Sequence, residues 1–432
     1  MLGGGIFTAM NKELPGAYIN FVSAERNITI ADRGIAALPL EMNWGADGEV
    51  IELDSVDYEN YSMCIFGYNF DAPEMLPVRE MFRNAKKVLI YKLNAGTKAS
   101  CTISEARYKG TRGNDIRHVI TTNVDDTSKM DVMTYVGTYL ADTQTVASSA
   151  ELEDNDFVVF KKTGELEATA GIQLAGGANG SITGAEHEAA LDALESHTFN
   201  VLGCMSEEDS VKKLYTAYCK RMRDELGIKF QVVVYNLDAD YIGVINLKNT
   251  VKDAGAKAYA LIPYVTGAEA GCAINKSLDN HAYTGEYTVK ADFKQSELKD
   301  MAKKGVFAFH NVGTTANVLS DVNSFVTFTE EMKEDFQLNQ VIRVLDQIAI
   351  DEAAIFCQKY LGKVQNDEGG RAGFWSDCVT IFKEYAKQRA IEDFAEEDIE
   401  ISKGITKRDV VVYQSIKPIC AMNKLYSTVC VK

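Results

Sequence analysis

The chain has 432 residues, of which 46% are hydrophobic and 25% charged, and its formal net charge is −17. Such a length predicts two to four domains, and the composition, with only six prolines, excludes a disordered chain. The strongly negative charge argues against a nucleic-acid-binding surface.

Nine cysteines are scattered along the chain without a CxxC pair. This pattern predicts free thiols in a protein made in a reducing cytoplasm. The N-terminus has no basic segment followed by an apolar core, so no secretory signal is expected. The most apolar stretch, 258–274, is interrupted by proline, glycine and glutamate, which favours a buried helix or loop over a membrane span.

A short strand is predicted near the start of the chain, after a glycine-rich leader and the turn-forming pair Pro15–Gly16. It consists of Ala17, Tyr18, Ile19, Asn20, Phe21 and Val22. A strand on such a leader either pairs within its own domain or adds to the sheet of a neighbour.

Between 31 and 92 the pattern is mixed. We expect a short strand at 50–53, helical turns at 57–68 and 72–84, and a buried strand at 87–92. From 93 to 178, short alternating runs broken by Gly, Asn and Asp predict an inserted all-β module, a small barrel or sandwich. Its strands are expected at 99–103, 117–123, 131–135 and 157–161.

A glycine cluster at 176–180 predicts a hinge, after which the pattern becomes β/α. Helices are expected at 184–196, from an N-cap at Ser206 to 226, and at 296–304. Strands are expected at 199–204, 230–235, 241–246, 306–309 and 324–328. The strand–helix–strand order around 199–235 predicts a βαβ unit with parallel pairing.

The last hundred residues predict two helices, at 336–361 and 373–392, on a small sheet with strands at 398–402 and 409–416. A final strand-like run closes the chain. It consists of Leu425, Tyr426, Ser427, Thr428, Val429, Cys430 and Val431. The fold class is therefore α+β and multidomain: a mixed α/β core, an inserted all-β module, and C-terminal helices on a small sheet.

Signatures of catalysis are missing from the sequence. It holds no GxxxxGK[ST], HExxH or GxSxG motif, and its five histidines are spread over the chain. Asp238-Ala239-Asp240 could ligate a cation but suits a turn better, and Gly110–Ile116, with Arg112, is either an anion loop or a tight turn. Lys383, Lys387 and Arg389 give the second C-terminal helix a basic side, which is a solvated face or a docking face for an acidic partner.

Several segments, in this order, resemble contractile phage tail sheath proteins over essentially the whole chain. They are Pro15–Phe21, Tyr108–Ile116, Ala175–Gly177, Asp240–Ile245 and Lys424–Tyr426. The resemblance is closest to the simpler sheaths of Gram-positive myophages, defective prophages and phage-tail-like bacteriocins.

The resemblance implies a structural subunit that polymerises as stacked hexameric rings around a tail tube and contracts to drive the tube through a target envelope. It implies partners in copies of the chain itself, the tail tube, and baseplate and terminator proteins, with no cofactor, nucleic acid or membrane insertion. The particle would be made in a bacterial cytoplasm and end as a virion tail or an extracellular tail-like particle.

Carried onto this sequence, the resemblance makes 17–22 the N-terminal arm strand and 425–431 the C-terminal arm strand. The receiving strand would be built from Val410, Val411, Val412 and Tyr413, and the resemblance leaves open which of the last two strands leaves its own subunit. Lys383, Lys387 and Arg389 would face the tube. The expected division is 1–30 (arm), 31–92 and 179–330 (α/β core), 93–178 (β module) and 331–432 (C-terminal domain). The alternatives are another virion component or an enzyme built on the βαβ core.

Overall fold

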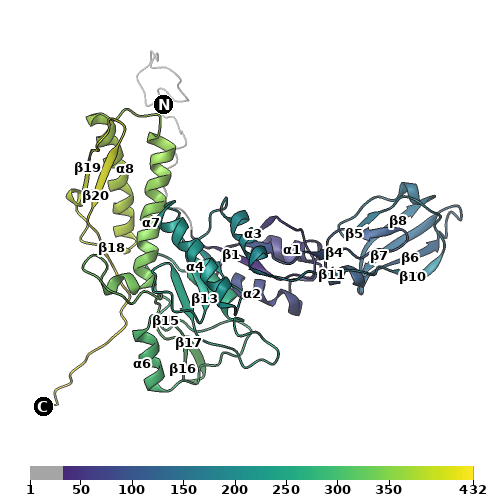
Figure 1. The fold of residues 1–432 in the computed structure, drawn as a ribbon, viewed down its shortest axis with the longest axis horizontal. Helices are drawn as coiled ribbons and strands as arrows, with labels where there is room; N and C mark the ends of the chain where they lie inside the picture. Colours follow the sequence, from purple (N-terminus) through teal and green to yellow (C-terminus); the bar gives the residue numbers. More distant parts are fainter. Residues whose placement is uncertain (1–32, 432) are drawn as a thin grey trace, which may run out of the picture. The chain divides into compact units, whose positions relative to one another are not determined.

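The computed structural model describes residues 33–431, so the predicted N-terminal strand at 17–22 lies outside the described part of the chain. Two compact units emerge from the contacts between residues. One contains 33–350 and the tail 418–431, and the other contains 351–417. Figure 1 shows the elements along the chain.

The first unit is built on a seven-stranded sheet in the order β15-β14-β13-β12-β1-β3-β2. The strands are β1 (Ile35–Leu40), β2 (Val50–Asp54), β3 (Lys87–Lys92), β12 (Val201–Gly203), β13 (Gln231–Tyr235), β14 (Val244–Leu247) and β15 (Val306–Phe307). All neighbours pair in parallel except the edge strand β2, which is antiparallel to β3. The central strands are almost wholly buried because helices cover both faces.

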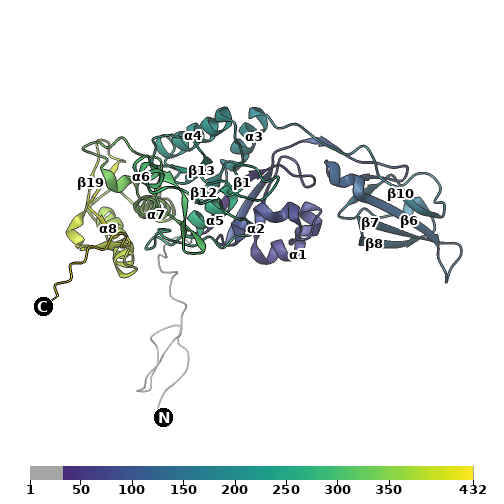
Figure 2. The same cartoon turned by 90° about the horizontal axis from the view of Figure 1, so that it is seen from below.

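Two helix layers cover this sheet, as Figure 2 shows. One face carries α1 (Ser55–Phe66), α2 (Leu76–Phe82) and α5 (Ile262–Gly271), and the other carries α3 (Gly184–Leu194) and α4 (Asp209–Asp224). Most residues of α5 are buried, which confirms that 258–274 belongs to a core. The α/β core predicted from the sequence is therefore present.

Residues between β3 and α3 form the predicted all-β module. A four-stranded antiparallel sheet has the order β10-β6-β7-β8, and β5 pairs with β9. The bounds are β5 (Ser104–Ala106), β6 (Ile116–Thr122), β7 (Met130–Val136), β8 (Tyr139–Val146), β9 (Val158–Phe160) and β10 (Thr169–Gln173). The strand expected at 99–103 is wrong, because that segment is a connection between short strands.

The chain enters and leaves this module through adjacent strands. β4 (Gly96–Thr97) pairs antiparallel with β11 (Ala178–Asn179). A Cβ on Gly96 would lie 2.0 Å from the carbonyl oxygen of Ala178, so glycine is required for this close approach. The predicted hinge at 176–180 is therefore half of a hydrogen-bonded ribbon.

The rest of the first unit holds α6 (Gln295–Lys303) and the hairpin β16 (Phe309–Val312) with β17 (Thr315–Val318). The strand expected at 324–328 is wrong. The backbone N–H groups of Val326 and Thr327 donate to the Asp240 carboxylate instead of to a sheet. Ser206 is not the N-cap of α4, because the position before the helix is Glu208, whose N–H donates to the Ser206 hydroxyl.

The chain passes from the first unit into the second along α7 (Asn339–Ile355), which ends in a π-helical turn, η5 (Phe356–Tyr360). The second unit continues with α8 (Glu368–Lys387), β18 (Ile391–Glu392), β19 (Ile399–Lys403) and β20 (Val410–Gln414), and β21 (Lys417–Pro418) follows. Single 3-10 turns are η1 (Pro73–Met75), η2 (Thr111–Asp115), η3 (Ser149–Glu151), η4 (Glu334–Gln337) and η6 (Glu396–Asp398).

Candidate inter-subunit surfaces

The predicted receiving strand is one half of a two-stranded sheet. β20 pairs antiparallel with β19, and the hairpin is anchored on α8 because the indole N–H of Trp375 donates to the Ile399 carbonyl at 2.9 Å. Val411 and Tyr413 on the outer face are 49% and 69% exposed. A two-stranded sheet is marginally stable by itself, so both its outer face and its edges are sites where further structure would add stability.

The hydrogen-bond phase of this hairpin shows which backbone groups its edges present. Gly404 donates to the Asp409 carbonyl, and Ser415 donates to the Asp398 carbonyl, so the opposed pairs at 404/409 and 398/415 are hydrogen-bonded. Because bonded and non-bonded pairs alternate along an antiparallel ladder, the backbone groups of Val410, Val412 and Gln414 point away from β19. They form the free edge of β20.

The two edges of the sheet differ. On β19, the outward groups are those of Ile399, Ile401 and Lys403, and the Ile399 carbonyl is already bonded to Trp375. On β20, no backbone group of 410–414 on the outer edge has a hydrogen-bond partner among the described residues. β20 is therefore the more open template for an added strand.

The C-terminal tail is held at its root and free beyond it. The Gln340 side chain donates to the Ile419 carbonyl and accepts from the Ala421 N–H, and Asn423 donates to the Asp279 carboxylate. From Leu425 onward the chain forms no strand, and Leu425, Tyr426, Val429 and Val431 are 90%, 89%, 82% and 94% exposed. Exposed apolar side chains in such number make the tail a candidate surface for contact with another chain.

The three basic residues expected to face the tube lie on α8 and just beyond it. Lys383 forms an ion pair with Glu396 at 2.5 Å, and Lys387 pairs with Glu384 at 3.1 Å. Arg389 follows the helix with a left-handed φ of 61°. The basic side exists, but its two lysines already have carboxylate partners within the same unit.

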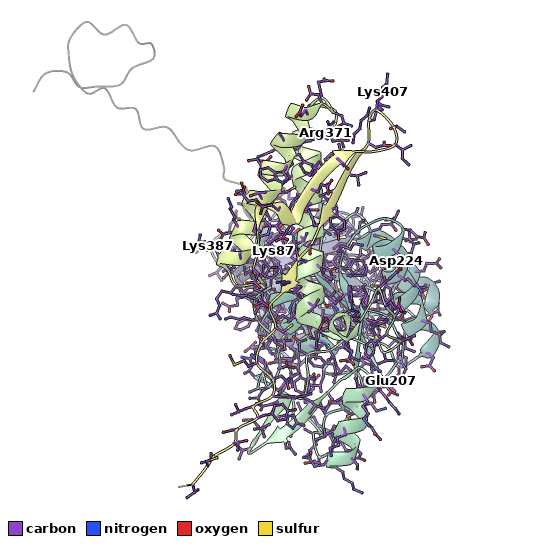
Figure 3. All side chains as sticks on the ribbon, turned by 90° about the vertical axis from the view of Figure 1, so that its left-hand side faces the viewer. Lys87, Glu207, Asp224, Arg371, Lys387 and Lys407 are labelled. Carbon is purple, nitrogen blue, oxygen red and sulfur yellow. The ribbon has the colours of Figure 1, made fainter. Side chains whose placement is uncertain are left out.

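At the turn end of the β19–β20 hairpin lies a cleft of about 440 Å³. Its walls combine Phe356 and Phe374 with the cations Arg371, Lys407 and Arg408, and no carboxylate lines it. Figure 3 shows Arg371 and Lys407 together at this end and Lys387 away from it. In a chain of net charge −17, this basic and aromatic end is unusual.

A buried charge network, unpredicted from the sequence, holds the start of α7 against the core. Arg343 bonds Glu269 of α5 at 2.5 Å and Asp321 at 2.6 Å, and Arg223 of α4 forms a bidentate pair with Asp346. Burial raises the pKa of Asp321, but the charge and hydrogen bond of Arg343, together with hydrogen bonds from Glu269 and the Leu278 N–H, outweigh burial and lower it. The signal that could have revealed the network is Glu269 itself, a carboxylate in an apolar stretch.

Other candidates from the sequence have structural roles. Asp240 caps the 326–327 backbone, and Arg112 donates to the Gly67 carbonyl and to Asp115. His118 is buried between Ser104 and Thr134. Within residues 33–431, no cluster of three or more potential ligands could hold a metal ion, and no helix is long and apolar enough to cross a membrane.

The enzyme alternative would place its site at the carboxyl ends of β1 and β12, where a cleft of about 360 Å³ opens. His187 lines this cleft, and its Nδ1 lies 2.9 Å from the Tyr215 hydroxyl. The Ser206 hydroxyl accepts from the backbone of Glu208. No serine–histidine hydrogen bond joins these two residues in the described structure, so the cleft does not form a nucleophile–base pair.

Comparison with known proteins decides the family. Four domain families match successive segments: tail sheath protein Gp18 domain III N-terminal region (33–93), phage tail sheath protein beta-sandwich domain (94–179), phage tail sheath protein central domain (180–324) and phage tail sheath C-terminal domain (331–432). The chain belongs to the phage tail sheath proteins.

The similarity to known relatives extends over nearly the whole length of the chain. The phage-like element PBSX protein XkdK of Bacillus subtilis is 32% identical, with 99% of each chain covered. The crystal structure of a sheath tail protein from Desulfitobacterium hafniense is 32% identical, with a TM-score of 0.82 over 94% of this chain and 100% of that one. The helical sheath of the anti-feeding prophage in its contracted state shares the fold, with a TM-score of 0.58 at 10% identity over 97% and 99% of the two chains. This sheath protein is thus a structural subunit of a contractile tail sheath.

Proposed function

We propose that this sheath protein polymerises as stacked hexameric rings around a tail tube, with each subunit joined to its neighbours by exchanged strands. On triggering, the polymer shortens and widens and drives the tube through a target cell envelope. The work comes from the free-energy difference between two packings of the same subunits. No chemical reaction or cofactor takes part.

One observation carries this proposal: the same chain holds an open strand edge and an unpaired strand-like tail. β20 exposes the backbone groups of Val410, Val412 and Gln414, and residues 425–431 expose their apolar side chains. Neither feature is satisfied within the described chain. Strand addition between copies would satisfy both at once, because main-chain hydrogen bonds supply affinity and alternate side chains supply specificity.

The N-terminal strand at 17–22 remains a second candidate for the same role. The sheet formed by β19 and β20 has two edges, so it can take one strand from each of two neighbours. We assign the tail strand, 425–431, to β20, whose edge is the more open, and the N-terminal strand to β19, where it would displace Trp375 from the Ile399 carbonyl. The five-part division of the chain expected from the sequence stays part of this proposal.

The proposed partners are copies of the chain, the tube, and the baseplate and terminator proteins at the two ends of the sheath. Lys383, Lys387 and Arg389 are the proposed tube contacts. The subunits would be made in a bacterial cytoplasm and act in a virion tail or an extracellular tail-like particle.

Negative-stain electron microscopy of the purified chain tests the proposal, beside one variant lacking 1–23 and one lacking 425–432. Long hollow tubes from the full chain, lost in either truncation, are expected. Tubes that persist unchanged in both truncations would refute strand exchange, and dispersed monomers in all three, also when tail tube is added as a template, would refute polymerisation.

A further inference from the structure

The tail root, residues 419–423, is separated from the strand-like run 425–431 by a very short linker. Asn423 is the last residue held by the core, through its bond to Asp279, and the strand-like run starts at Leu425. Only Lys424 separates the two. Since one residue spans at most about 3.6 Å, the strand must begin within about 7 Å of the root. Any sheet that receives residues 425–431 therefore lies directly against the surface from which the tail leaves.

That surface is acidic. A cleft of about 570 Å³ lies at the root and is lined by Cys420, Ala421, Asn423 and Lys424 of the tail together with Asp279, Asp321, Glu334 and Asp335. Asp321 is neutralised by Arg343. Glu334 and Asp335 are exposed, and neither forms an ion pair among the described residues. A neighbouring subunit that contacts the root must place cations beside these carboxylates. Otherwise its own negative charge would be repelled by them.

The second compact unit, 351–417, carries the β19–β20 hairpin and is called the hairpin unit below. Cationic side chains gather at the turn end of this hairpin. Arg371, Lys407 and Arg408 line the cleft there, no carboxylate lines it, and none of the three forms an ion pair among the described residues. At the other end of the hairpin the lysines are already paired, Lys383 with Glu396 and Lys417 with Asp393. Of the two ends of the hairpin, the turn end therefore has the charge that complements the acidic cleft at the tail root.

We propose that the acidic cleft at the tail root is a docking surface for the basic turn end of a second copy's hairpin unit. Glu334 and Asp335 of one copy face Lys407 and Arg408 of the next, with Lys424 as a one-residue tether. This inference rests on the proposed strand exchange. It also fixes a direction: Leu425 lies beside Val410 of the second copy, so the tail strand runs parallel to β20.

Tether length is tested by inserting Gly-Ser-Gly-Ser between Asn423 and Lys424, with the same four residues inserted between Val431 and Lys432 as the matched control. The readout is the critical concentration for polymer formation, measured by pelleting and checked by electron microscopy. The tether insertion is expected to raise it at least about tenfold, the effect of losing ~1.4 kcal/mol per contact, while the downstream insertion leaves it within about threefold. Equal tolerance of both insertions would overturn the short tether.

Charge pairing is tested by reversal. E334K/D335K is expected to raise the critical concentration at least about tenfold, and E330K/E331K, in the same loop but outside the cleft lining, by less than about threefold. Combining E334K/D335K with K407E/R408E should restore assembly to within about threefold of wild type, which also shows that the variants fold. No restoration, or equal effects of the two loop variants, would overturn the docking surface.

The truncation of 425–432 separates the two proposals. If the truncated chain polymerises like the wild type, strand exchange by the tail is itself wrong. If truncation abolishes polymers but the tether insertion and the charge reversals do not, strand exchange stands and only the docking surface fails.

Discussion

A proline at Val412 tests the open edge of β20 most directly. The Val412 N–H points away from β19, so replacing it removes no bond within the hairpin, and edge strands tolerate proline for this reason. In the assembly the same N–H would bond to the added strand. Its loss costs about 0.5–1.5 kcal/mol, and the pyrrolidine ring adds a steric penalty against a closely paired backbone.

Each strand contact then weakens by about 1.5–3 kcal/mol, which corresponds to an increase of roughly 10- to 100-fold in the critical concentration. The matched control is V412A, which shortens the same side chain but keeps the backbone N–H that the added strand would bond. Pelleting assays across a concentration series, with circular dichroism to show that both monomers keep the hairpin, measure the difference. If V412P polymerises at the same critical concentration as V412A and the wild type, our assignment of the β20 edge is wrong.

Three further predictions concern stability and the tube contact. R343A strips the charge partner from two buried carboxylates and should cost about 3–5 kcal/mol, read as a lower Tm in calorimetry, whereas the exposed R408A should cost less than about 0.5 kcal/mol. Burial lowers the pKa of His118 to about 4, so the β module should be fully stabilised above pH ~6.5 and lose up to about 3 kcal/mol as the pH falls toward 4. H118Q should flatten that pH dependence. An unchanged profile of stability against pH would contradict our assignment of the pH dependence to His118. K383E/K387E should reduce tube-templated assembly while leaving assembly without tube unaffected, and equal loss in both would exclude a tube contact.

Buried elements with a strong local pattern were predictable. The runs at 87–92 and 230–235 are rich in β-branched, aromatic and other apolar residues, and both form interior strands of the sheet. Elements at the surface were not predictable. β8 was missed because half of its residues are exposed and its sequence shows no apolar alternation. The segment 324–328 has a strand-like composition, but its backbone bonds to a carboxylate far away in the sequence.

The candidate inter-subunit surfaces likewise have features that could be predicted from the sequence and features that could not. The receiving strand follows from Val410–Tyr413 alone, because three consecutive valines and a tyrosine favour a strand. Which edge it presents depends on the hydrogen-bond phase, which is set by the turn and not by composition. The Arg343 network joins residues 22 and 74 positions apart, so no local pattern could bring them together.

The ribbon of β4 and β11 has a consequence for engineering. Its two strands are hydrogen-bonded neighbours, so the β module is attached to the core by two chain ends that already lie side by side. Joining Thr97 to Ala178 through a two-residue turn such as Asn-Gly would complete a hairpin and remove the module while keeping all seven strands of the core sheet. The Trp44 ring, which packs on Tyr108 and Phe157 of the module, would then need a new cover. A sheath subunit with this junction is thus a modular scaffold, in which a foreign domain with adjacent termini could replace residues 98–177.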